Sequence, residues 1–355
     1  MKTVALYNLG CKVNSYEMEG MGQELREKGY RIVPFEEKAD IYIVNTCTVT
    51  NIADRKSRQM LHRARQLNPD AVVVAVGCYV QTGLAKVEKD AGIDLAVGNN
   101  HKKDIAELLE KYLAERWKRR DTGGGQEEQM SKTLHGATVT DMNRSCEYEE
   151  MQLRQTTEHT RAYIKIQDGC NQFCSYCVIP YARGRVRSRR AEDILQEIRA
   201  LVDAGYREVV LTGIHISSYG IDFPYRLLGG PDAPGAGGDM PEGGGISGSA
   251  RELSAGTGGE GGKNGSAGEG AVGTSGDGGK SGLKYNGSSK LIELIELIHE
   301  IPGLDRIRLG SLEPRIINEE TAGRLAAMPK LCPHFHLSLQ SGCDATLKRM
   351  NRHYT

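Results

Sequence analysis

Three cysteines, Cys170, Cys174 and Cys177, form a C-x3-C-x2-C run within the stretch DGCNQFCSYCVIPYARGR. This spacing offers three thiolates to a single metal cluster. A cluster with four cysteine ligands is saturated and passes electrons only, whereas a cluster with three leaves one iron open to a substrate. A structural zinc site is the alternative, but such sites usually close with four ligands, and the sequence nearby supplies no fourth cysteine or histidine. The run therefore predicts an iron–sulfur cluster with an open iron.

Cys11, Cys47 and Cys78 lie far apart in the sequence, yet each directly follows a predicted strand, in LYNLGC, IVNTC and VAVGC. The carboxyl ends of the strands in an open parallel sheet meet at one edge, where ligands bind. Gly10 and Gly77 precede two of the cysteines and permit a tight turn. A single cysteine in such a place is ordinarily a buried thiol. Three at equivalent positions predict a second three-cysteine site.

Two basic segments accompany these cysteines. The stretch RGRVRSRR follows the C-x3-C-x2-C run, and it is either a solvated loop or an anion clamp for a nucleic-acid phosphate or a cofactor carboxylate. Its arginines are Arg183, Arg185, Arg187, Arg189 and Arg190. The predicted helix 52–67 begins just after Cys47, and its basic side is either a solvated face or a border of the second site. Its basic residues are Arg55, Lys56, Arg58, His62, Arg63 and Arg65.

Other polar or small residues end predicted strands in the second half of the chain. Gly213 ends one strand, Glu313 follows the next, and Gln340 ends the last. Barrel enzymes keep their active sites at the carboxyl ends of the strands, so these residues are candidates for binding a ligand with hydroxyl and amino groups. Cys332 and Cys343 lack metal-ligand spacing and are interpreted as structural.

The elements that must position these residues alternate between strand and helix. Residues 1–120 predict an open parallel sheet with helices on both sides, of the Rossmann or flavodoxin-like kind. The predicted strands are 4–9, 41–44, 72–76 and 93–97, and the predicted helices are 14–28, 52–67 and 104–119. The strand at 72–76 is continuously apolar, which is typical of a strand buried on both faces. Residues 121–160 are polar and predict a linker.

The alternation resumes at residue 161. Strands are predicted at 162–167, 208–212, 306–309 and 334–340, and helices at 191–204, 290–301, 318–328 and from 344. Four strands are too few to close a (β/α) barrel, so this part is either an open half-barrel or a truncated TIM-type barrel, and the abrupt end favours truncation. Residues 228–289 are dominated by glycine and serine and predict a disordered insertion rather than a functional lid.

Composition narrows the class of protein further. The 355 residues carry 46 Lys and Arg against 46 Asp and Glu, so no overall charge drives binding to nucleic acid or membrane. No stretch predicts a signal peptide or a membrane span. Nine cysteines in a chain without a leader favour the cytoplasm, where thiols serve metals and catalysis.

These residues resemble the radical S-adenosylmethionine (SAM) methylthiotransferases. GCNQFCSYC resembles the family's radical-generating [4Fe–4S] motif, and Cys11, Cys47 and Cys78 resemble the ligands of its auxiliary [4Fe–4S] cluster. NLGCKVNSYE and NTCTVTNIADRKSR are similar to the branch that acts on N6-threonylcarbamoyladenosine at position 37 of tRNA. Isopentenyladenosine and a ribosomal-protein aspartate are the substrates of the alternative branches. The resemblance covers residues 1–120 and 160–355, and it leads us to expect that the family's C-terminal TRAM-like RNA-binding domain is absent.

The resemblance implies that SAM and two [4Fe–4S] clusters are the cofactors. One cluster and SAM generate a radical that removes hydrogen from C2 of the adenine, and the other supplies sulfur, which a second SAM methylates. It implies cofactor contacts for Tyr176, Gly213, Glu313 and Gln340. The expected partners are tRNA and a donor such as flavodoxin or ferredoxin, with no membrane and a monomeric chain. A two-cluster electron-transfer protein that binds nucleic acid is the competing hypothesis, and without the RNA-binding domain weak tRNA binding is expected.

Overall fold

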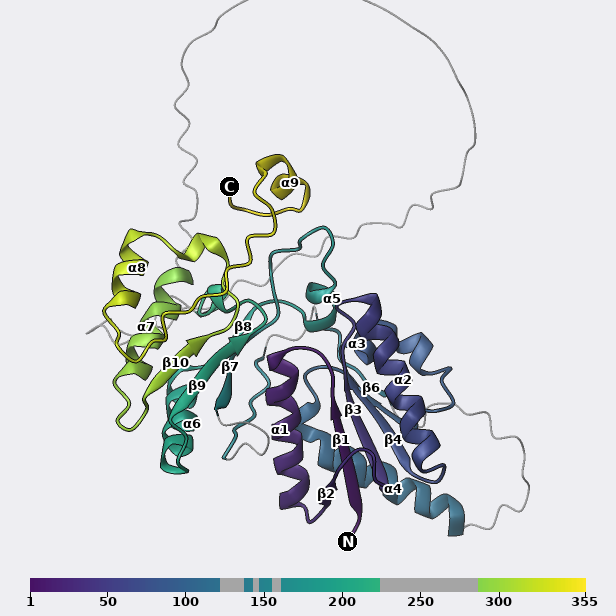
Figure 1. Ribbon diagram of the computed structural model, residues 1–355. Coiled ribbons are helices and arrows are strands. Elements are labelled where there is room, and N and C mark those ends of the chain that lie inside the picture. Colours follow the sequence, from purple (N-terminus) through teal and green to yellow (C-terminus); the bar gives the residue numbers. More distant parts are fainter. Residues whose placement is uncertain (122–136, 143–146, 155–160, 224–286) are drawn as a thin grey trace, which may run out of the picture. The chain divides into compact units, whose positions relative to one another are not determined.

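The computed structural model describes residues 1–121, 137–142, 147–154, 161–223 and 287–355 (Figure 1). These residues contain two sheets, called sheet A and sheet B, within one compact unit. The predicted disordered insertion at 228–289 lies outside the described residues, apart from 287–289, which begin a helix. The prediction of disorder there stays a prediction.

Sheet A is an open parallel sheet with the strand order β2-β1-β3-β4-β5-β6 (Figure 1). Its strands are β1 (Thr3–Asn8), β2 (Arg31–Val33), β3 (Ile41–Thr46), β4 (Val72–Gly77), β5 (Leu95–Val97) and β6 (Ala137–Thr138). The strands β3 and β4 are buried along their whole length. This confirms the parallel α/β sheet predicted for the first part of the chain.

Helices cover both faces of sheet A. Val72, Val74 and Val76 of β4 face the core formed with α1 (Lys12–Glu27) and α4 (Ile105–Asp121). The alternate residues, Val73 and Ala75, face the core formed with α2 (Asn51–Leu67) and α3 (Cys78–Val87). Since successive side chains of a strand point to opposite faces, burial on both sides explains the continuous apolar run.

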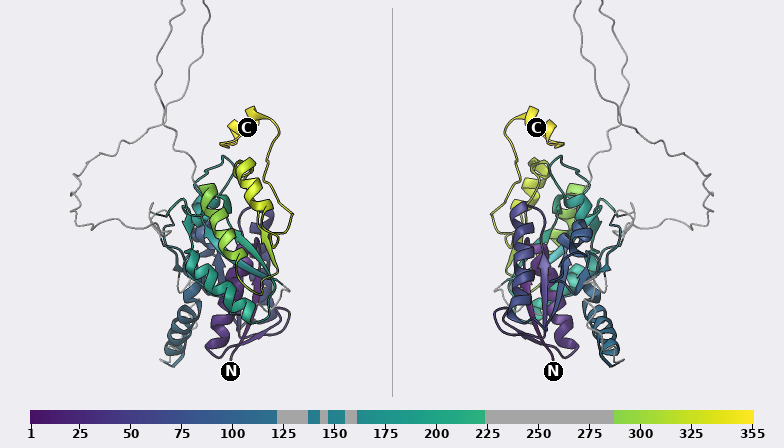
Figure 2. Two further views of the ribbon diagram at one scale, coloured as in Figure 1. Left: turned by 90° about the vertical axis from the view of Figure 1, so that its left-hand side faces the viewer. Right: turned by 90° about the vertical axis from the view of Figure 1, so that its right-hand side faces the viewer.

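Sheet B has the order β10-β9-β7-β8, with β8 antiparallel to β7 and the other pairs parallel. Its strands are β7 (Ala162–Asp168), β8 (Arg187–Ser188), β9 (Glu208–Gly213) and β10 (Arg306–Leu309). The helices α6 (Ala191–Asp203), α7 (Gly287–His299) and α8 (Glu319–Ala326) lie side by side against one face (Figure 2). The other face of β7 carries Lys165 and Gln167, which are both buried.

The predicted strand at 334–340 is wrong. Within this segment Leu337 makes one isolated bridge, with Leu312, and a second isolated bridge, Ile307 with Leu331, lies just before the segment. Pro333 lies between the two bridges and has no backbone N–H for a ladder hydrogen bond, which interrupts the pairing. Residues 333–337 are exposed, so burial does not hold them in a continuous strand.

The predicted linker at 121–160 also differs from the structure where it is described. Residues 137–138 form β6, which extends sheet A beside β5. Met151 and Leu153 are buried in the core on the α1 face of this sheet. The described parts of the segment therefore belong to the fold of sheet A rather than connecting two finished domains.

Several helices beyond the predicted ones are present. The helix α3 begins at Cys78 directly after β4, and Gly83 interrupts its helical backbone. The helix α5 (Ile179–Arg183) follows the C-x3-C-x2-C run. The helix α9 (Asp344–Arg349) was predicted, and it begins at the predicted residue 344. Across the described ranges, no helix combines the length and the apolar character that crossing a membrane requires.

Glu24 on α1 gives a pH-dependent prediction. Burial raises the pKa of this carboxyl from 4.5 to about 7, and the negative charge of Asp104 adds to the effect. Because the folded pKa is the higher one, this group's contribution to stability falls as the pH rises from about 4.5 to 7. We expect Glu24→Gln to increase the free energy of unfolding by about 1 kcal/mol at pH 8, discounted for partial exposure, with little change at pH 5.

Urea titrations of the full chain at both pH values would measure this effect. Glu27→Gln, an exposed position on the same helix, is the control and should change little at either pH. An equal change for Glu24→Gln at pH 5 and pH 8 would show that its carboxyl does not titrate as inferred.

Candidate functional site

The N-terminal cysteine group consists of Cys11, Cys47 and Cys78, which follow β1, β3 and β4. These three strands are neighbours in sheet A and run parallel, so their carboxyl ends meet at one edge. Cys47 and Cys78 are buried, and Cys11 is exposed. The structure therefore brings together three cysteines that are 31 to 67 positions apart in the sequence.

Two glycines allow the close approach at this edge. Gly10 has a φ of +106°, and a Cβ there would lie 3.1 Å from the Cys47 sulfur. Gly77 has a φ of +96°, and a Cβ there would lie 2.8 Å from Asn45 Oδ1. Both positions have a left-handed backbone and no room for a side chain, so glycine is required there. This agrees with the tight turns that the sequence predicted at Gly10 and Gly77.

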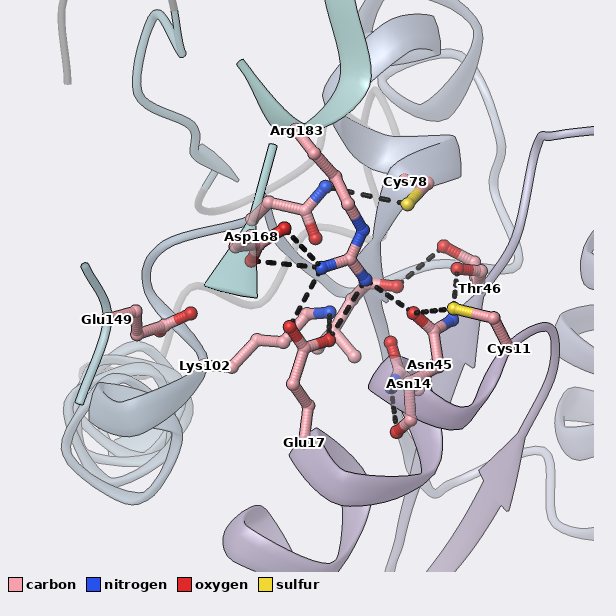
Figure 3. Close-up of polar contacts among 12 residues, drawn as sticks. Cys11, Asn14, Glu17, Asn45, Thr46, Cys78, Lys102, Glu149, Asp168 and Arg183 are labelled. Atoms are coloured by element: carbon pink, nitrogen blue, oxygen red, sulfur yellow. Dashed lines mark hydrogen bonds and ion pairs between the residues drawn. The ribbon is translucent and has the colours of Figure 1, made fainter. Parts of the chain in front are cut away.

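The thiols of this group influence one another. Burial raises the pKa of Cys47, and the nearby thiols of Cys78 and Cys11 raise it further. Asn99 Nδ2 donates a hydrogen bond to Cys78 Sγ at 3.5 Å. Cys11 Sγ lies 4.0 Å from Asn14 Oδ1 (Figure 3). Three crowded thiols would repel one another as thiolates unless a cation lay between them.

The loop cysteine group consists of Cys170, Cys174 and Cys177 in the loop after β7. Burial raises the pKa of Cys170 to about 11, and the charges of Cys174, Cys177 and Glu313 add to the effect. The backbone N–H of Gln172 donates to Cys170 Sγ at 3.5 Å. Hydrogen bonds to ligand sulfurs are among the features that set the potential of iron–sulfur clusters.

Both groups fit a cluster better than a single metal ion. Over the part of the chain that the structure describes, no three His, Cys, Asp or Glu side chains are placed to hold one metal ion. In a cluster each cysteine binds a different iron, so the thiols lie farther apart than the ligands of a zinc ion, with Zn–S bonds of about 2.3 Å. In each group three cysteine sulfurs come together, and one of them, Cys78 or Cys170, accepts a hydrogen bond from an N–H group, which is the donor set of such a cluster.

Glu313 lies beside the loop cysteine group. Its side chain is buried, 3.3 Å from His215 Nε2, and its Oε2 accepts a hydrogen bond from Gln172 Nε2 at 3.4 Å. Although burial acts to raise it, the hydrogen bond from His215 keeps the pKa of Glu313 below its ordinary value. The other oxygen, Oε1, is buried without a hydrogen-bond partner. An ionised carboxylate with an orphaned oxygen fits a cofactor that carries an amino group.

The other predicted cofactor contacts have different surroundings. A Cβ at Gly213 would lie 2.9 Å from the backbone oxygen of Gln167, so packing within sheet B explains this glycine. Tyr176 is exposed, and its hydroxyl accepts a hydrogen bond from Arg352 at 2.9 Å. Gln340 is exposed and has a left-handed φ of 62°. Contacts of Tyr176, Gly213 and Gln340 with a cofactor stay predictions.

The predicted anion clamp at 183–190 requires correction. Arg183, Arg187 and Arg189 are buried and paired with carboxylates. They cannot bind an RNA phosphate in this arrangement, because their charges are already compensated inside the protein. Arg185 is exposed and lies over the ring of Phe173, 4.4 Å from its centroid. Because three of its five arginines are buried in ion pairs, the segment is neither a fully solvated loop nor a clamp built from all of its arginines.

A buried charge network joins the two halves of the described chain, and sequence reasoning missed it. Glu17 on α1 pairs with Arg183 at 2.9 Å, with Lys165 at 2.8 Å and with Lys102. Asp168, at the end of β7, pairs with Lys165 at 2.7 Å. It also pairs with Arg183 at 3.1 Å (Figure 3). The network is Glu17, Lys102, Lys165, Asp168, Arg183 and Arg187.

The sequence contained a signal for this network. Lys165 stands in the middle of the strand sequence AYIKIQD, and Glu17 stands between the buried residues Tyr16 and Met18. A charged residue within an apolar element must find a partner when it is buried. Although burial acts to raise it, the charges of Arg183, Lys102 and Lys165 hold the pKa of Glu17 well below its ordinary value.

Sequence reasoning also missed the residues after α9. Asn351 Nδ2 donates hydrogen bonds to the backbone oxygens of Gln172 and Phe173 at 3.2 and 3.0 Å. The backbone N–H of Ser175 donates to the oxygen of Met350 at 3.2 Å. These hydrogen bonds attach the segment after α9 to the loop that carries the loop cysteine group. The residues are so distant in the sequence that only the fold brings them together.

Comparison with known proteins defines the class. Residues 164–355 match the family model of the radical SAM superfamily, and residues 3–98 match that of the uncharacterized protein family UPF0004. The chain therefore belongs to the radical SAM superfamily. Membership implies a [4Fe–4S] cluster and SAM as cofactors, which the loop cysteine group and Glu313 fit.

The named proteins to which the chain is similar are tRNA-modifying enzymes. The chain is 35% identical over its whole length to the threonylcarbamoyladenosine tRNA methylthiotransferase MtaB of Bacillus subtilis, and it covers 61% of that protein. Over 99% of its length it is 33% identical to the Aquifex aeolicus MtaB, of which it covers 66%. It is 29% identical to the Moorella thermoacetica tRNA-2-methylthio-N(6)-dimethylallyladenosine synthase, of which it covers 63%. The chain thus spans about three fifths to two thirds of these relatives.

A solved structure supports the fold alone. The radical SAM methyltransferase TsrM of Kitasatospora setae, with cobalamin and a [4Fe–4S] cluster bound, matches with a TM-score of 0.54 and 17% identity. The match covers 100% of this chain and 65% of the other.

Proposed function

We propose that this chain carries the catalytic part of a tRNA methylthiotransferase that converts N6-threonylcarbamoyladenosine at position 37 to its 2-methylthio derivative. One observation carries the proposal: two separate three-cysteine groups lie at the carboxyl ends of strands in one compact unit. A radical generator alone needs one such group, whereas a reaction that also inserts sulfur has a use for two. The relatives named MtaB support the choice of substrate.

The residues would have distinct roles. When bound, the two clusters and SAM supply a carbon radical, a sulfur atom and a methyl group. Cys170, Cys174 and Cys177 would hold the radical-generating cluster, and Cys11, Cys47 and Cys78 would hold the auxiliary one. Glu313 would accept a hydrogen bond from the amino group of SAM through its unpartnered Oε1. Gln172 orients this carboxylate and also donates its backbone N–H to Cys170.

The surface beside the N-terminal cysteine group suits an RNA partner. The helix α2 begins shortly after Cys47 and exposes Arg55, Lys56, Arg58 and Arg63. Ile52 and Val49 are exposed apolar residues at the start of the same helix and just before it. Cations for the phosphates and apolar surface for a base are the features that binding of an unpaired nucleotide requires.

The test uses chain reconstituted anaerobically with iron and sulfide, then reduced in the presence of SAM. It receives tRNA that carries either threonylcarbamoyladenosine or isopentenyladenosine, and mass spectrometry of the nucleosides detects the product. We expect the 2-methylthio form of the first nucleoside. Product from the second alone would contradict the proposed substrate. Two clusters without any cleavage of SAM would favour an electron-transfer protein and contradict the enzyme itself.

A further inference from the structure

Arg183 lies between the two cysteine groups. It ends α5, the short helix that follows the loop cysteine group. Its guanidinium donates to Asn14 Oδ1 at 2.5 Å and to Glu17 at 2.9 and 3.1 Å, both on α1 (Figure 3). It also donates to Asp168 at 3.1 and 3.2 Å. The side chain thus comes from the second half of the chain and points at the helix that begins beside Cys11.

Two contacts bring this residue to the N-terminal cysteine group. Asn14 Oδ1 accepts a hydrogen bond from Arg183, and the same oxygen lies 4.0 Å from Cys11 Sγ. Asn99 Nδ2 donates both to Cys78 Sγ at 3.5 Å and to the backbone oxygen of Ala182 at 2.7 Å. The positive charge of Arg183 therefore lies close enough to act on the thiols of Cys47 and Cys78.

With Arg183 counted, the buried charge network and Glu149 together carry one cation more than they carry carboxylates, and the site is dry. Four cations of the buried charge network face its two carboxylates, and Glu149, whose charge also acts on Lys165, adds a third. The Arg183 side chain is 1% exposed, so solvent screens its charge little. A cluster bound by three thiolates carries about one net negative charge when oxidised and a further one when reduced. An anion at the N-terminal cysteine group would complement these cations.

We propose that Arg183 is a positioning residue for the cluster of the N-terminal cysteine group, and that its charge stabilises the reduced form of that cluster. The inference rests on the proposed function, because it requires a cluster on Cys11, Cys47 and Cys78. It goes further in making this site depend on a residue from the radical SAM half of the chain. The N-terminal half alone would hold the cluster without the charge that sets its potential.

The test is a redox titration followed by electron paramagnetic resonance. Replacing Cys170, Cys174 and Cys177 by alanine in the full chain leaves the N-terminal cluster as the source of the signal. In this background we expect Arg183→Met to lower the equilibrium constant for reduction about tenfold, a midpoint about 59 mV more negative for one electron. Arg183→Lys keeps the charge and should move the midpoint much less.

A second variant makes the opposite prediction. Glu17→Gln removes a negative charge that contacts Arg183, so it should move the midpoint to a more positive value. If Arg183→Met does not fold, this variant still tests whether the charge beside the cluster changes its midpoint potential. A structural role of these residues would not produce shifts of opposite sign.

Arg189→Met is the matched control. Arg189 is buried in the same segment, and it pairs with Glu197 and Glu150, which are not members of the buried charge network. We expect it to lower stability without moving the midpoint. A normal iron content with an unchanged midpoint in Arg183→Met, or an equal shift in Arg189→Met, would overturn the inference alone. A background chain that binds no iron would overturn the proposed auxiliary cluster, and the inference with it.

Discussion

Replacing Cys174 by alanine will abolish reductive cleavage of SAM, whereas replacing Cys47 by alanine will leave cleavage intact and abolish the methylthio product. Cys174 belongs to the loop cysteine group beside Glu313, and Cys47 lies in the N-terminal group at the edge of sheet A. Because each group would serve a different step, each loss should stop one step only. We expect each affected rate to fall about 100-fold or more.

Three measurements separate the two variants. Iron and sulfide analysis should give about half of the wild-type content for each, because each variant would lose one of two clusters. Chromatography then measures deoxyadenosine from SAM, and mass spectrometry measures the modified nucleoside. Cys343→Ala, at an exposed cysteine before α9, is the control and should retain all three. A Cys47→Ala chain that still forms product would exclude sulfur delivery from the N-terminal group.

Replacing Glu17 by alanine should cost about 3–5 kcal/mol of folding free energy, as removal of one partner of a buried ion pair does. Its carboxylate contacts Lys102, Lys165 and Arg183, which are all buried. Without it, three cations would face each other with Asp168 as the remaining carboxylate of the network. Denaturant unfolding of the full chain, followed by circular dichroism, measures the loss.

Glu27→Ala is the control for this prediction. Glu27 lies on the same helix, is exposed and pairs with Arg154 at 3.7 Å. Its replacement should change the free energy of unfolding by about 0.5 kcal/mol or less. If Glu17→Ala were as mild as this control, the buried network would add little to stability.

The sequence predicted the strands that are apolar on both faces. β3, β4 and β9 were found because a parallel sheet covered by helices leaves continuous runs of Val, Ile and Leu. Short elements were missed because they contain no such run. Two-residue strands such as β6 and β8 contain too few positions for any periodicity, and contacts with neighbouring strands define them.

The candidate site was predictable where chemistry depends on local spacing. The loop cysteine group is one short stretch, and the N-terminal group could be found because each cysteine ends a strand. The roles of the arginines could not be predicted in this way. Arg183 and Arg185 are two positions apart and both lie in a basic stretch, yet one is buried against Glu17 and the other is exposed. Two partners of Arg183, Glu17 and Asn14, lie 166 and 169 positions away, and no local pattern encodes such pairs.

The late strand β6 has a consequence for how the chain folds as the ribosome makes it. Sheet A receives its edge strand from residues 137–138, and Tyr16 on α1 donates a hydrogen bond to the backbone oxygen of Met151. The ion pair between Glu17 and Arg183 can form only after Arg183 has been synthesised, which is later still. At about 5–20 residues per second, synthesis reaches residue 183 about 4–17 s after residue 98. The nascent first half would lack its edge strand until residue 138 is made, and Glu17 would lack Arg183 until the end of the interval. A chaperone that shields newly made chains would bind this incomplete sheet.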